Sequence, residues 1–303
     1  MAETVITSPA TKRCAVVTGG NKGIGLELCR QLASNGVLVV LTARDEKKGI
    51  EAVENLKGCG LPDVVFHQLD VTDSASVASL ADFIKTHFGK LDILVNNAGI
   101  GGFSVDNDAL KTTKLSDAVE ERAQSFFRAI RETYELAKEC LETNYYGTKR
   151  VTEALVPLLQ LSNSATIVNV SSSAGLLKNI SNERAKELLS NIDELTEEKV
   201  DELLNEFLKD YKDGLSESKG WPVTGSAYKM SKAAMNTYTR FLASKFPSFR
   251  INSVCPSYVK TDINFNTGIL TVEEGAGSIL RLALLPSDGP TGLFFSKMEV
   301  SPF

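Results

Sequence analysis

The sequence predicts an α/β protein with a doubly wound parallel sheet of about seven strands. Short apolar runs, such as residues 37–42 and 64–70, alternate with segments of helical periodicity. Near-continuous apolar strands of this kind are typical of a parallel sheet that helices cover on both faces. With 303 residues, of which 43% are hydrophobic, the chain can bury one large core. We therefore expect one domain over residues 1–303, with helical insertions near 104–135 and 176–224.

Composition excludes several classes of partner. The net charge of -5 argues against a surface for nucleic acid or anionic lipid, because both attract clustered cations. The five cysteines are scattered and lack metal-site spacing, which favours reduced thiols and no bound metal. Residues 1–12 lack the apolar core of a signal peptide, and no later run approaches a membrane span. We expect a cytoplasmic protein that acts on a small molecule.

The first strand-like run, residues 14–18, leads into a glycine-rich loop and then a helix whose periodicity ends at Asn35-Gly36. Glycines let a backbone approach a pyrophosphate, and the free amides of the following helix attract its charge. The spacing Gly-x-x-x-Gly-x-Gly differs from the usual fingerprint, so a tight turn is the alternative. We favour a Rossmann-type dinucleotide site, to which we assign Thr18, Gly19, Asn21, Lys22, Gly23, Ile24 and Gly25.

The second strand-like run ends at Ala43-Arg44-Asp45. Enzymes selective for NAD usually place a carboxylate at this strand tip, whereas the 2′-phosphate of NADP needs cations. Arg44 stands at the tip, with Lys22 in the glycine loop and Lys48 one helical turn further on. This pattern favours NADPH. The alternative is that these cations are solvated and that Asp45 binds the ribose.

Two further strand ends complete the expected cofactor cleft. Residues 64–70 and 91–99 are apolar runs separated by a helical segment over 76–88. Asp70, with Val71 beside it, is placed to accept from an adenine amino group, although turn chemistry is a competing explanation for Asp70. The floor of the cleft is assigned to Asn97, Ala98 and Gly99.

Tyr228 and Lys232 lie four residues apart in a segment that reads as helix, so both side chains rise from one face. A phenol with a pKa near 10 is a poor acid or base at neutral pH. A nearby cation favours the phenolate and moves the pKa toward the range needed for proton transfer to a carbonyl oxygen. The spacing alone also occurs by chance on many helices.

Five motifs stand in the order found in the short-chain dehydrogenase/reductase family, and the resemblance covers nearly the whole chain. Further strands are expected at residues 166–171, 249–255 and near 293–296. Finer features, such as Phe103-Ser-Val-Asp106 and Trp221-Pro222, are similar to a plant subgroup of that family. The five motifs are Thr18-Gly19-(x)3-Gly23-Ile24-Gly25, Asn96-Asn97-Ala98-Gly99, Ser172, Tyr228-(x)3-Lys232 and Pro256-Ser257-Tyr258-Val259-Lys260-Thr261.

The resemblance implies catalytic roles for four residues. Tyr228 becomes the proton donor, and Lys232 lowers its pKa while holding the nicotinamide ribose. Ser172 hydrogen-bonds the same substrate oxygen, and the helix of Asn144 supports a water that leads protons to Lys232. Two alternatives stay open. The first is that Ser171 or Ser173, in the same serine run, has the role given to Ser172. The second is that Asn144 is only a helix residue whose hydrogen bonds are satisfied.

The loop after the strand at 249–255 departs from the family pattern. Relatives commonly have Pro-Gly where this chain has Pro256-Ser257, so the backbone must tolerate a Cβ there. By the resemblance, Val259 and Thr261 anchor the nicotinamide carboxamide. The serine makes that assignment less secure.

Two insertions are expected to shape the substrate side. After Thr196, an acidic first turn precedes an apolar stripe that includes Val200 and Phe207, which predicts an amphipathic helix. Residues 106–133 are also longer than a crossover needs. These elements either roof the cleft or cover the helix faces through which many relatives oligomerise, and a locally packed surface helix is a third reading. The subgroup resemblance implies a monomer with a lid.

The sequence thus predicts an NADP-dependent oxidoreductase, an NADPH-dependent carbonyl reductase. Its substrate class by resemblance is a bulky apolar ketone, such as a monoterpene ketone or an alkaloid dienone. The same residues run alcohol oxidation with NADP+ in reverse, and a nucleotide sensor without turnover is the non-enzymatic alternative. Candidates for lining the substrate pocket, besides Ser172, are Phe103, Val105, Asp106, Ile263 and Asn264.

Overall fold

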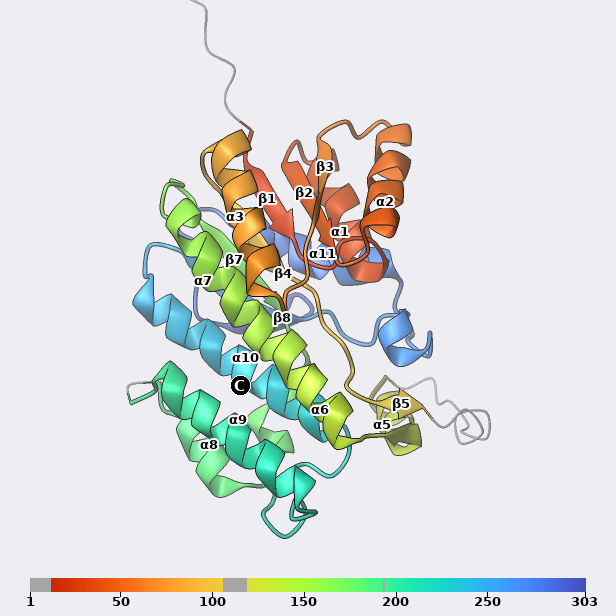
Figure 1. The fold of residues 1–303 in the computed structure, drawn as a ribbon, viewed down its shortest axis with the longest axis vertical. Helices are drawn as coiled ribbons and strands as arrows, with labels where there is room; N and C mark the ends of the chain where they lie inside the picture. The colour runs from red at the N-terminus through yellow and green to blue at the C-terminus, as the bar shows by residue number, and fades with distance from the viewer. Residues whose placement is uncertain (1–11, 106–118, 193) are drawn as a thin grey trace, which may run out of the picture.

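The computed structural model describes residues 12–105, 119–192 and 194–303. Among these residues, one mostly parallel sheet has eight strands in the order β10-β9-β8-β7-β4-β1-β2-β3 (Figure 1). The sequence predicted about seven strands; the additional one is the edge strand β10, which pairs antiparallel with β9. The strands are β1 (Cys14–Val17), β2 (Leu38–Ala43), β3 (Val64–Gln68), β4 (Ile93–Asn96), β7 (Thr166–Val170), β8 (Arg250–Cys255), β9 (Phe294–Ser296) and β10 (Glu299–Ser301).

The strand order reverses at β1, and this reversal places the site. Ala15 pairs in register with Val39 of β2 on one side and with Ile93 of β4 on the other. The chain therefore winds outward in both directions from the same strand. In open α/β sheets, ligands bind beyond the carboxyl ends of the strands at such a switch point.

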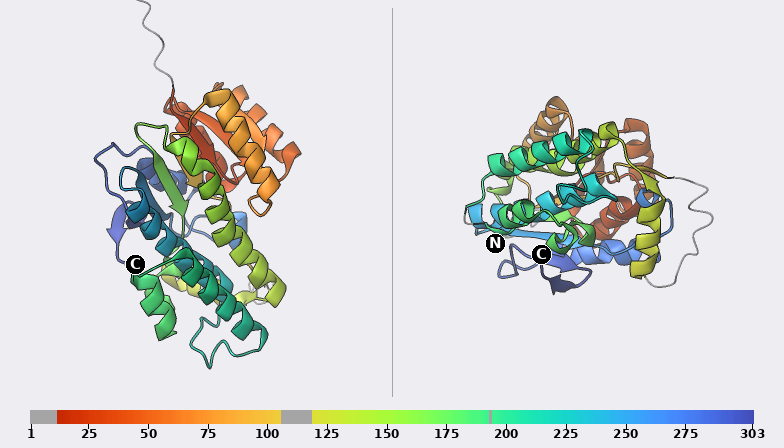
Figure 2. Two further views of the ribbon diagram at one scale, coloured as in Figure 1. Left: turned by 60° about the vertical axis from the view of Figure 1, so that its left-hand side comes forward. Right: turned by 90° about the horizontal axis from the view of Figure 1, so that it is seen from below.

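Helices cover both faces of the sheet (Figure 2). Side chains of β1 alternate between the two layers: Ala15 and Val17 join the core under α1, α2 and α11, whereas Val16 joins the core under α3, α7 and α10. The covering helices are α1 (Gly23–Ser34), α2 (Glu46–Gly58), α3 (Ser74–Phe88), α6 (Tyr134–Leu141), α7 (Gly147–Leu159), α10 (Ser226–Lys245) and α11 (Val272–Ala283). The fold is therefore the predicted Rossmann-type α/β architecture.

The second insertion forms α8 (Glu183–Ser190) and α9 (Glu197–Lys212), after the short turns η2 (Ser173–Gly175) and η3 (Leu177–Asn179). The Thr196 hydroxyl accepts from Lys199 N at 3.3 Å, so the expected N-cap is confirmed. Leu204 and Phe207 of the α9 stripe are fully buried in the core that also holds α10. Figure 1 places α8 and α9 outside α10, so α9 covers helix faces.

The first insertion contributes side chains of α5 to the wall of a cleft. Its described part consists of β5 (Ser104–Val105), α5 (Val119–Ala129) and β6 (Ile130–Arg131), and β5 pairs antiparallel with β6. Asp106 lies outside the described residues. Within the described part of the chain, no helix has both the length and the apolar character needed to cross a membrane.

Candidate active site

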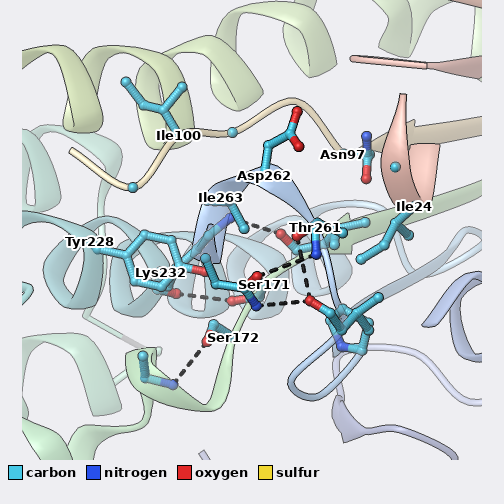
Figure 3. A pocket seen from close by; sticks show the side chains of 18 of the residues that line it. Ile24, Asn97, Ile100, Ser171, Ser172, Tyr228, Lys232, Thr261, Asp262 and Ile263 are labelled. Atoms are coloured by element: carbon cyan, nitrogen blue, oxygen red, sulfur yellow. Dashed lines mark hydrogen bonds between the residues drawn. The ribbon is translucent and has the colours of Figure 1, made fainter. Parts of the chain in front are cut away.

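A cleft of about 1330 Å³ opens at the carboxyl ends of the central strands. Its walls come from the glycine loop, the ends of β4, β7 and β8, the first turns of α10, and the first insertion. Figure 3 shows Tyr228 near one end of this cleft and Ile24 and Asn97 toward the other. Groups far apart in sequence therefore meet in one cavity.

The glycine loop is shaped for close approach of a ligand. Gly19 and Gly23 have φ values of 64° and 55°, which L side chains rarely adopt. A Cβ at Gly25 would lie 2.4 Å from Gly19 O and 2.5 Å from Asn97 Nδ2. α1 begins without a side-chain cap from Lys22 and without an acidic residue in its first turn. The positive end of α1 is thus left for an anion such as a pyrophosphate.

Thr18 and Asn97 brace this loop from beneath. The Thr18 hydroxyl accepts from Asn97 N and Ala98 N, both at 2.9 Å. Asn97 Nδ2 donates to Thr18 O at 2.9 Å and to Gly19 O at 3.1 Å. The Thr18 hydroxyl and the Asn97 Nδ2 group therefore fix the floor of the cleft beneath the loop.

The residues after β2 bear on whether Asp45 binds a ribose or Arg44 binds a 2′-phosphate. Asp45 caps α2, because its Oδ1 accepts from Lys48 N at 3.0 Å, and its Oδ2 lies 3.8 Å from Lys48 Nζ. Its carboxylate is therefore engaged away from the cleft. Arg44 and Lys22 line the cleft, whereas Lys48 lies outside the residues that line it. Of the three predicted cations, only these two line the cleft in the described structure.

Asp70 both lines the cleft and forms the turn that the sequence analysis named as its competitor. Its Oδ1 accepts from Thr72 N at 2.9 Å and from Thr72 Oγ1 at 2.7 Å. Burial alone would raise the pKa of Asp70, but the hydrogen bonds from Thr72 and nearby Arg44 and Arg150 outweigh it and hold that pKa below its usual value. Asp70 is therefore an ionised acceptor beside Val71, which also lines the cleft.

Tyr228 and Ser172 both line the cleft (Figure 3). Burial raises the pKa of the Tyr228 phenol well above its ordinary value, and a hydrogen bond with the Ser172 side chain acts in the opposite direction. The neighbouring serines also line the cleft, but their hydroxyls bind other protein groups: Ser171 Oγ donates to Lys232 O at 3.4 Å, and Ser173 Oγ accepts from Cys255 Sγ at 3.7 Å. The geometry thus favours Ser172 within the serine run.

Lys232 lies one turn after Tyr228 on α10 and is almost fully buried. Its Nζ donates to Val170 O at 2.9 Å and lies 5.7 Å from the centroid of the Tyr228 ring. Desolvation by burial lowers the pKa of Lys232 to about 8. The expected lowering of the Tyr228 pKa by Lys232 is therefore not seen. The side chain that lowers it is Ser172, and Lys232 supplies an ammonium whose own pKa is about 8.

Asn144 sits in a π-helical turn, Glu142–Tyr146, between α6 and α7. Its Oδ1 accepts from Ile100 N at 2.8 Å, and its Nδ2 donates to Ile100 O at 2.9 Å and to Ser231 Oγ at 3.0 Å. A Cβ at Gly99 would lie 3.2 Å from Asn144 Oδ1 and 3.6 Å from Lys232 Nζ. The amide is fully satisfied, so Asn144 joins the end of β4 to α10, and π-helical turns frequently mark functional sites.

The loop after β8 carries the predicted carboxamide anchors, Val259 and Thr261, at the cleft wall. Ser257 has a φ of 71°, so the backbone does hold a Cβ in a left-handed conformation. Asn264 Nδ2 donates to Val259 O at 2.8 Å, and its Oδ1 accepts from Thr261 N at 3.3 Å. The Asn264 side chain was expected to line the substrate pocket. Its two hydrogen bonds use its amide to brace this loop.

An aromatic wall forms the substrate side of the cleft. Phe126 of α5 lies with its ring centroid 5.5 Å from Phe103 and 6.4 Å from Phe265, and 6.5 Å from Tyr258. Val105 pairs with Ile130 and is not among the residues that line the cleft. The other predicted pocket residues in the described structure line it: Phe103, Ser172, Ile263 and Asn264. The sequence analysis assigned none of Phe126, Tyr258 and Phe265 to the pocket.

Metal chemistry has no ready site in the described part of the chain, where no group of three or more His, Cys, Asp or Glu side chains is placed to hold a metal ion. The polar groups of the cleft are hydroxyls, amides, cations and the carboxylates of Asp70 and Asp262. Such groups suit an anionic organic cofactor and an oxygen-bearing substrate.

Comparisons with known proteins agree with this geometry. The family model described as short chain dehydrogenase matches residues 13–184. Salutaridine reductase of Papaver somniferum is 56% identical over all of both chains, and (+)-neomenthol dehydrogenase of Capsicum annuum is 57% identical over 96% of this chain and 98% of its own. The solved structure of salutaridine reductase from Papaver somniferum superposes with a TM-score of 0.88 at 58% identity, covering 94% of this chain and 99% of the other.

Proposed function

Because this chain belongs to the short-chain dehydrogenase/reductase family, we propose that it is an NADPH-dependent carbonyl reductase acting on a bulky, largely apolar ketone. The observation that carries the proposal is that Tyr228, Ser172 and Lys232 line one cleft, between the glycine loop and the aromatic wall. A hydroxyl pair at that position can hold and protonate a carbonyl oxygen.

The residues of the cleft fit NADPH. The open N-terminus of α1 and the room that only glycine leaves at Gly25 suit a pyrophosphate. Arg44 and Lys22 supply the cations for a 2′-phosphate, Asp70 an acceptor for adenine, and Val259 and Thr261 the wall beside the carboxamide. When bound, this cofactor supplies the hydride from C4 of its nicotinamide ring.

Tyr228 is the proposed proton donor. Its raised pKa keeps the phenol protonated at neutral pH, which is the state that reduction requires. Ser172 orients the same oxygen by hydrogen bonding. Lys232, with its lowered pKa, is placed to return a proton to the phenol, and the π-helical turn of Asn144 holds the adjacent end of β4. The reverse oxidation needs the phenolate and is therefore expected only at higher pH.

The substrate class follows from the aromatic wall and from the names of the relatives. Phe103, Phe126 and Phe265 present ring surface rather than charge to this end of the cleft. Relatives named for salutaridine and neomenthol are 56% and 57% identical. A monoterpene ketone or an alkaloid dienone is accordingly the substrate to test first.

We infer a monomer built as one domain with two insertions of different roles. α5 of the first insertion brings Phe126 and Phe127 to the cleft and acts as the lid. α9, which is described throughout, contributes no residue to the cleft and packs on α6 and α10. By covering those helix faces, it removes the surface that many relatives use to oligomerise.

Replacement of Tyr228 by Phe tests the function. NADPH consumption with menthone, related cyclic ketones and morphinan dienones is followed by absorbance, and NADPH affinity by fluorescence titration. Tyr228→Phe is expected to abolish ketone reduction and to leave NADPH affinity within roughly two-fold, because only the proton donor is lost. A wild-type protein that binds NADPH but reduces no ketone would instead support a nucleotide sensor.

A further inference from the structure

The N-terminus of α10, the helix that carries Tyr228 and Lys232, lacks a cap of its own. Its N-cap residue is Gly225, in a left-handed conformation with no side chain to offer, and the first turn contains no acidic residue. Ser226 and Ala227 are almost fully buried, so water cannot readily satisfy their amides. Unpaired amides at a buried helix end are costly, and another group must accept from them.

Glu132 supplies this cap from the first insertion. Ser226 N donates to Glu132 Oε2 at 3.0 Å, while Ser226 Oγ and Ala227 N donate to Glu132 Oε1 at 3.1 and 3.3 Å. A carboxylate at this end is also favoured by the helix dipole. Glu132 directly follows β6 and precedes α6, so its backbone is held between two ordered elements.

The α5 helix of the first insertion also packs against the N-terminus of α10. A Cβ at Gly225 would lie 2.5 Å from Phe127 Cε1, so only glycine lets the Phe127 ring of α5 approach there. Lys229, which follows Tyr228, places its Nζ 5.3 Å from the centroid of that ring. The first turn of α10, which carries Tyr228, is thus held in place by contacts with the α5–β6 segment at the cleft.

We propose that Glu132 is a positioning residue for Tyr228. Its carboxylate sets the first turn of α10 and couples the placement of the phenol to the α5–β6 segment. This inference rests on the proposed ketone reduction for its kinetic consequence, while its structural core, the capping of Ser226 and Ala227, does not. Cofactor binding depends on the glycine loop and Lys232, away from this helix end, and stays unaffected.

The test compares Glu132→Ala and Glu132→Gln with Glu135→Gln, a matched change at an exposed glutamate of the adjacent helix α6. Because misplacing a reacting group by about 1 Å can cost roughly 100-fold, Glu132→Ala is expected to lower kcat by about 10-fold or more with NADPH affinity within about two-fold. Glu132→Gln keeps an acceptor oxygen and should recover part of the loss. Glu135→Gln should behave as wild type.

Thermal unfolding of each variant, and hydrogen exchange at the Ser226 and Ala227 amides, separate positioning from loss of fold. Faster exchange confined to these amides in a folded Glu132→Ala protein supports the inference. Unchanged exchange, or a kcat within about two-fold of wild type, overturns it. If the wild type reduces no ketone, the proposed function fails, and the exchange measurement alone decides the role of Glu132.

Discussion

Lys22 Nζ lies 2.7 Å from Asp262 Oδ2, and this ion pair joins the glycine loop to the loop after Thr261 across the cofactor cleft. Both side chains are 66% exposed, so the pair contributes little to stability. Lys22 is also one of the two cations that line the cleft and suit a 2′-phosphate. We therefore expect Asp262 to compete with the proposed cofactor for the Lys22 ammonium.

Asp262→Asn is predicted to tighten NADPH binding. Removing the carboxylate frees Lys22, and an exposed pair of this kind is worth at most about 1 kcal/mol, so the gain should be about two- to five-fold. Fluorescence titration at low and high salt measures it, and the gain should shrink in high salt. Asp213→Asn, at the end of α9, is the control and should have no effect. Weaker NADPH binding in Asp262→Asn would mean that the pair helps to close the cleft.

Arg44→Glu is predicted to shift cofactor preference toward NADH. A charge-assisted hydrogen bond to a phosphate contributes roughly 1.5–3 kcal/mol, so NADPH affinity should fall by about 10- to 100-fold while NADH affinity changes little. Lys48→Glu is the matched control, because Lys48 lies one turn on but outside the cleft lining. Preference that is unchanged in Arg44→Glu, or lost equally in Lys48→Glu, would place the 2′-phosphate elsewhere.

Reduction is predicted to slow as pH rises through about 8, where buried Lys232 loses its proton. Tyr228 remains protonated across this range because its own pKa is raised, so the decline reports the return of a proton from Lys232. The measurement is kcat/KM for ketone reduction over about pH 6 to 10, which reports groups of the free enzyme. Lys229→Gln is the control. A flat wild-type profile, or a transition that disappears in Lys229→Gln, contradicts the assignment.

The same shift has a consequence for stability. The folded protein releases the Lys232 proton at about pH 8, while the unfolded chain keeps it until near the ordinary value of 10.5. Between these values the unfolded state binds more protons, so this residue makes the free energy of unfolding rise with pH.

The cover formed by α9 leads to a prediction about stability and assembly. Leu204 is fully buried, so Leu204→Ala should lower the free energy of unfolding by about 2–4 kcal/mol. Leu208→Ala, at a half-buried position of the same helix, should cost less. Denaturant unfolding measures both, and gel filtration should give a monomer for the wild type. A dimer mass would show that α9 leaves an oligomer surface open.

Local sequence patterns predicted seven of the eight strands of the sheet. Those strands are apolar runs next to helices or glycine turns, and their burial makes the pattern strong. β10 was missed because Glu299–Ser301 is short and solvent-facing, and it is defined only by pairing with β9 after a turn at Lys297, whose φ is 55°. An edge strand of this kind leaves no hydrophobic pattern in the sequence.

In the candidate site, too, local motifs could be predicted from the sequence, and contacts between distant segments could not. The glycine loop and the Tyr228–Lys232 pair were found because their chemistry is contained within a few residues. The aromatic wall was not, since Phe126 and Phe265 come from segments far apart in the chain and meet only through tertiary packing. The same holds for Glu132, whose bond to Ser226 N spans 94 positions, and for Lys22, whose expected phosphate contact is shared with Asp262.

Ser257 provides a final prediction, because it holds a φ of 71° where relatives commonly have glycine. A left-handed conformation costs a residue with a Cβ roughly 1–2 kcal/mol, and glycine removes this strain from the folded state. Glycine also gives the unfolded chain more conformational entropy, which offsets part of the gain in stability. Ser257→Gly should therefore raise the free energy of unfolding by about 0.5–1 kcal/mol. Ser287→Gly, at an exposed position without a positive φ, should give no gain. A destabilised Ser257→Gly protein would mean that the serine side chain makes a contact that outweighs the strain.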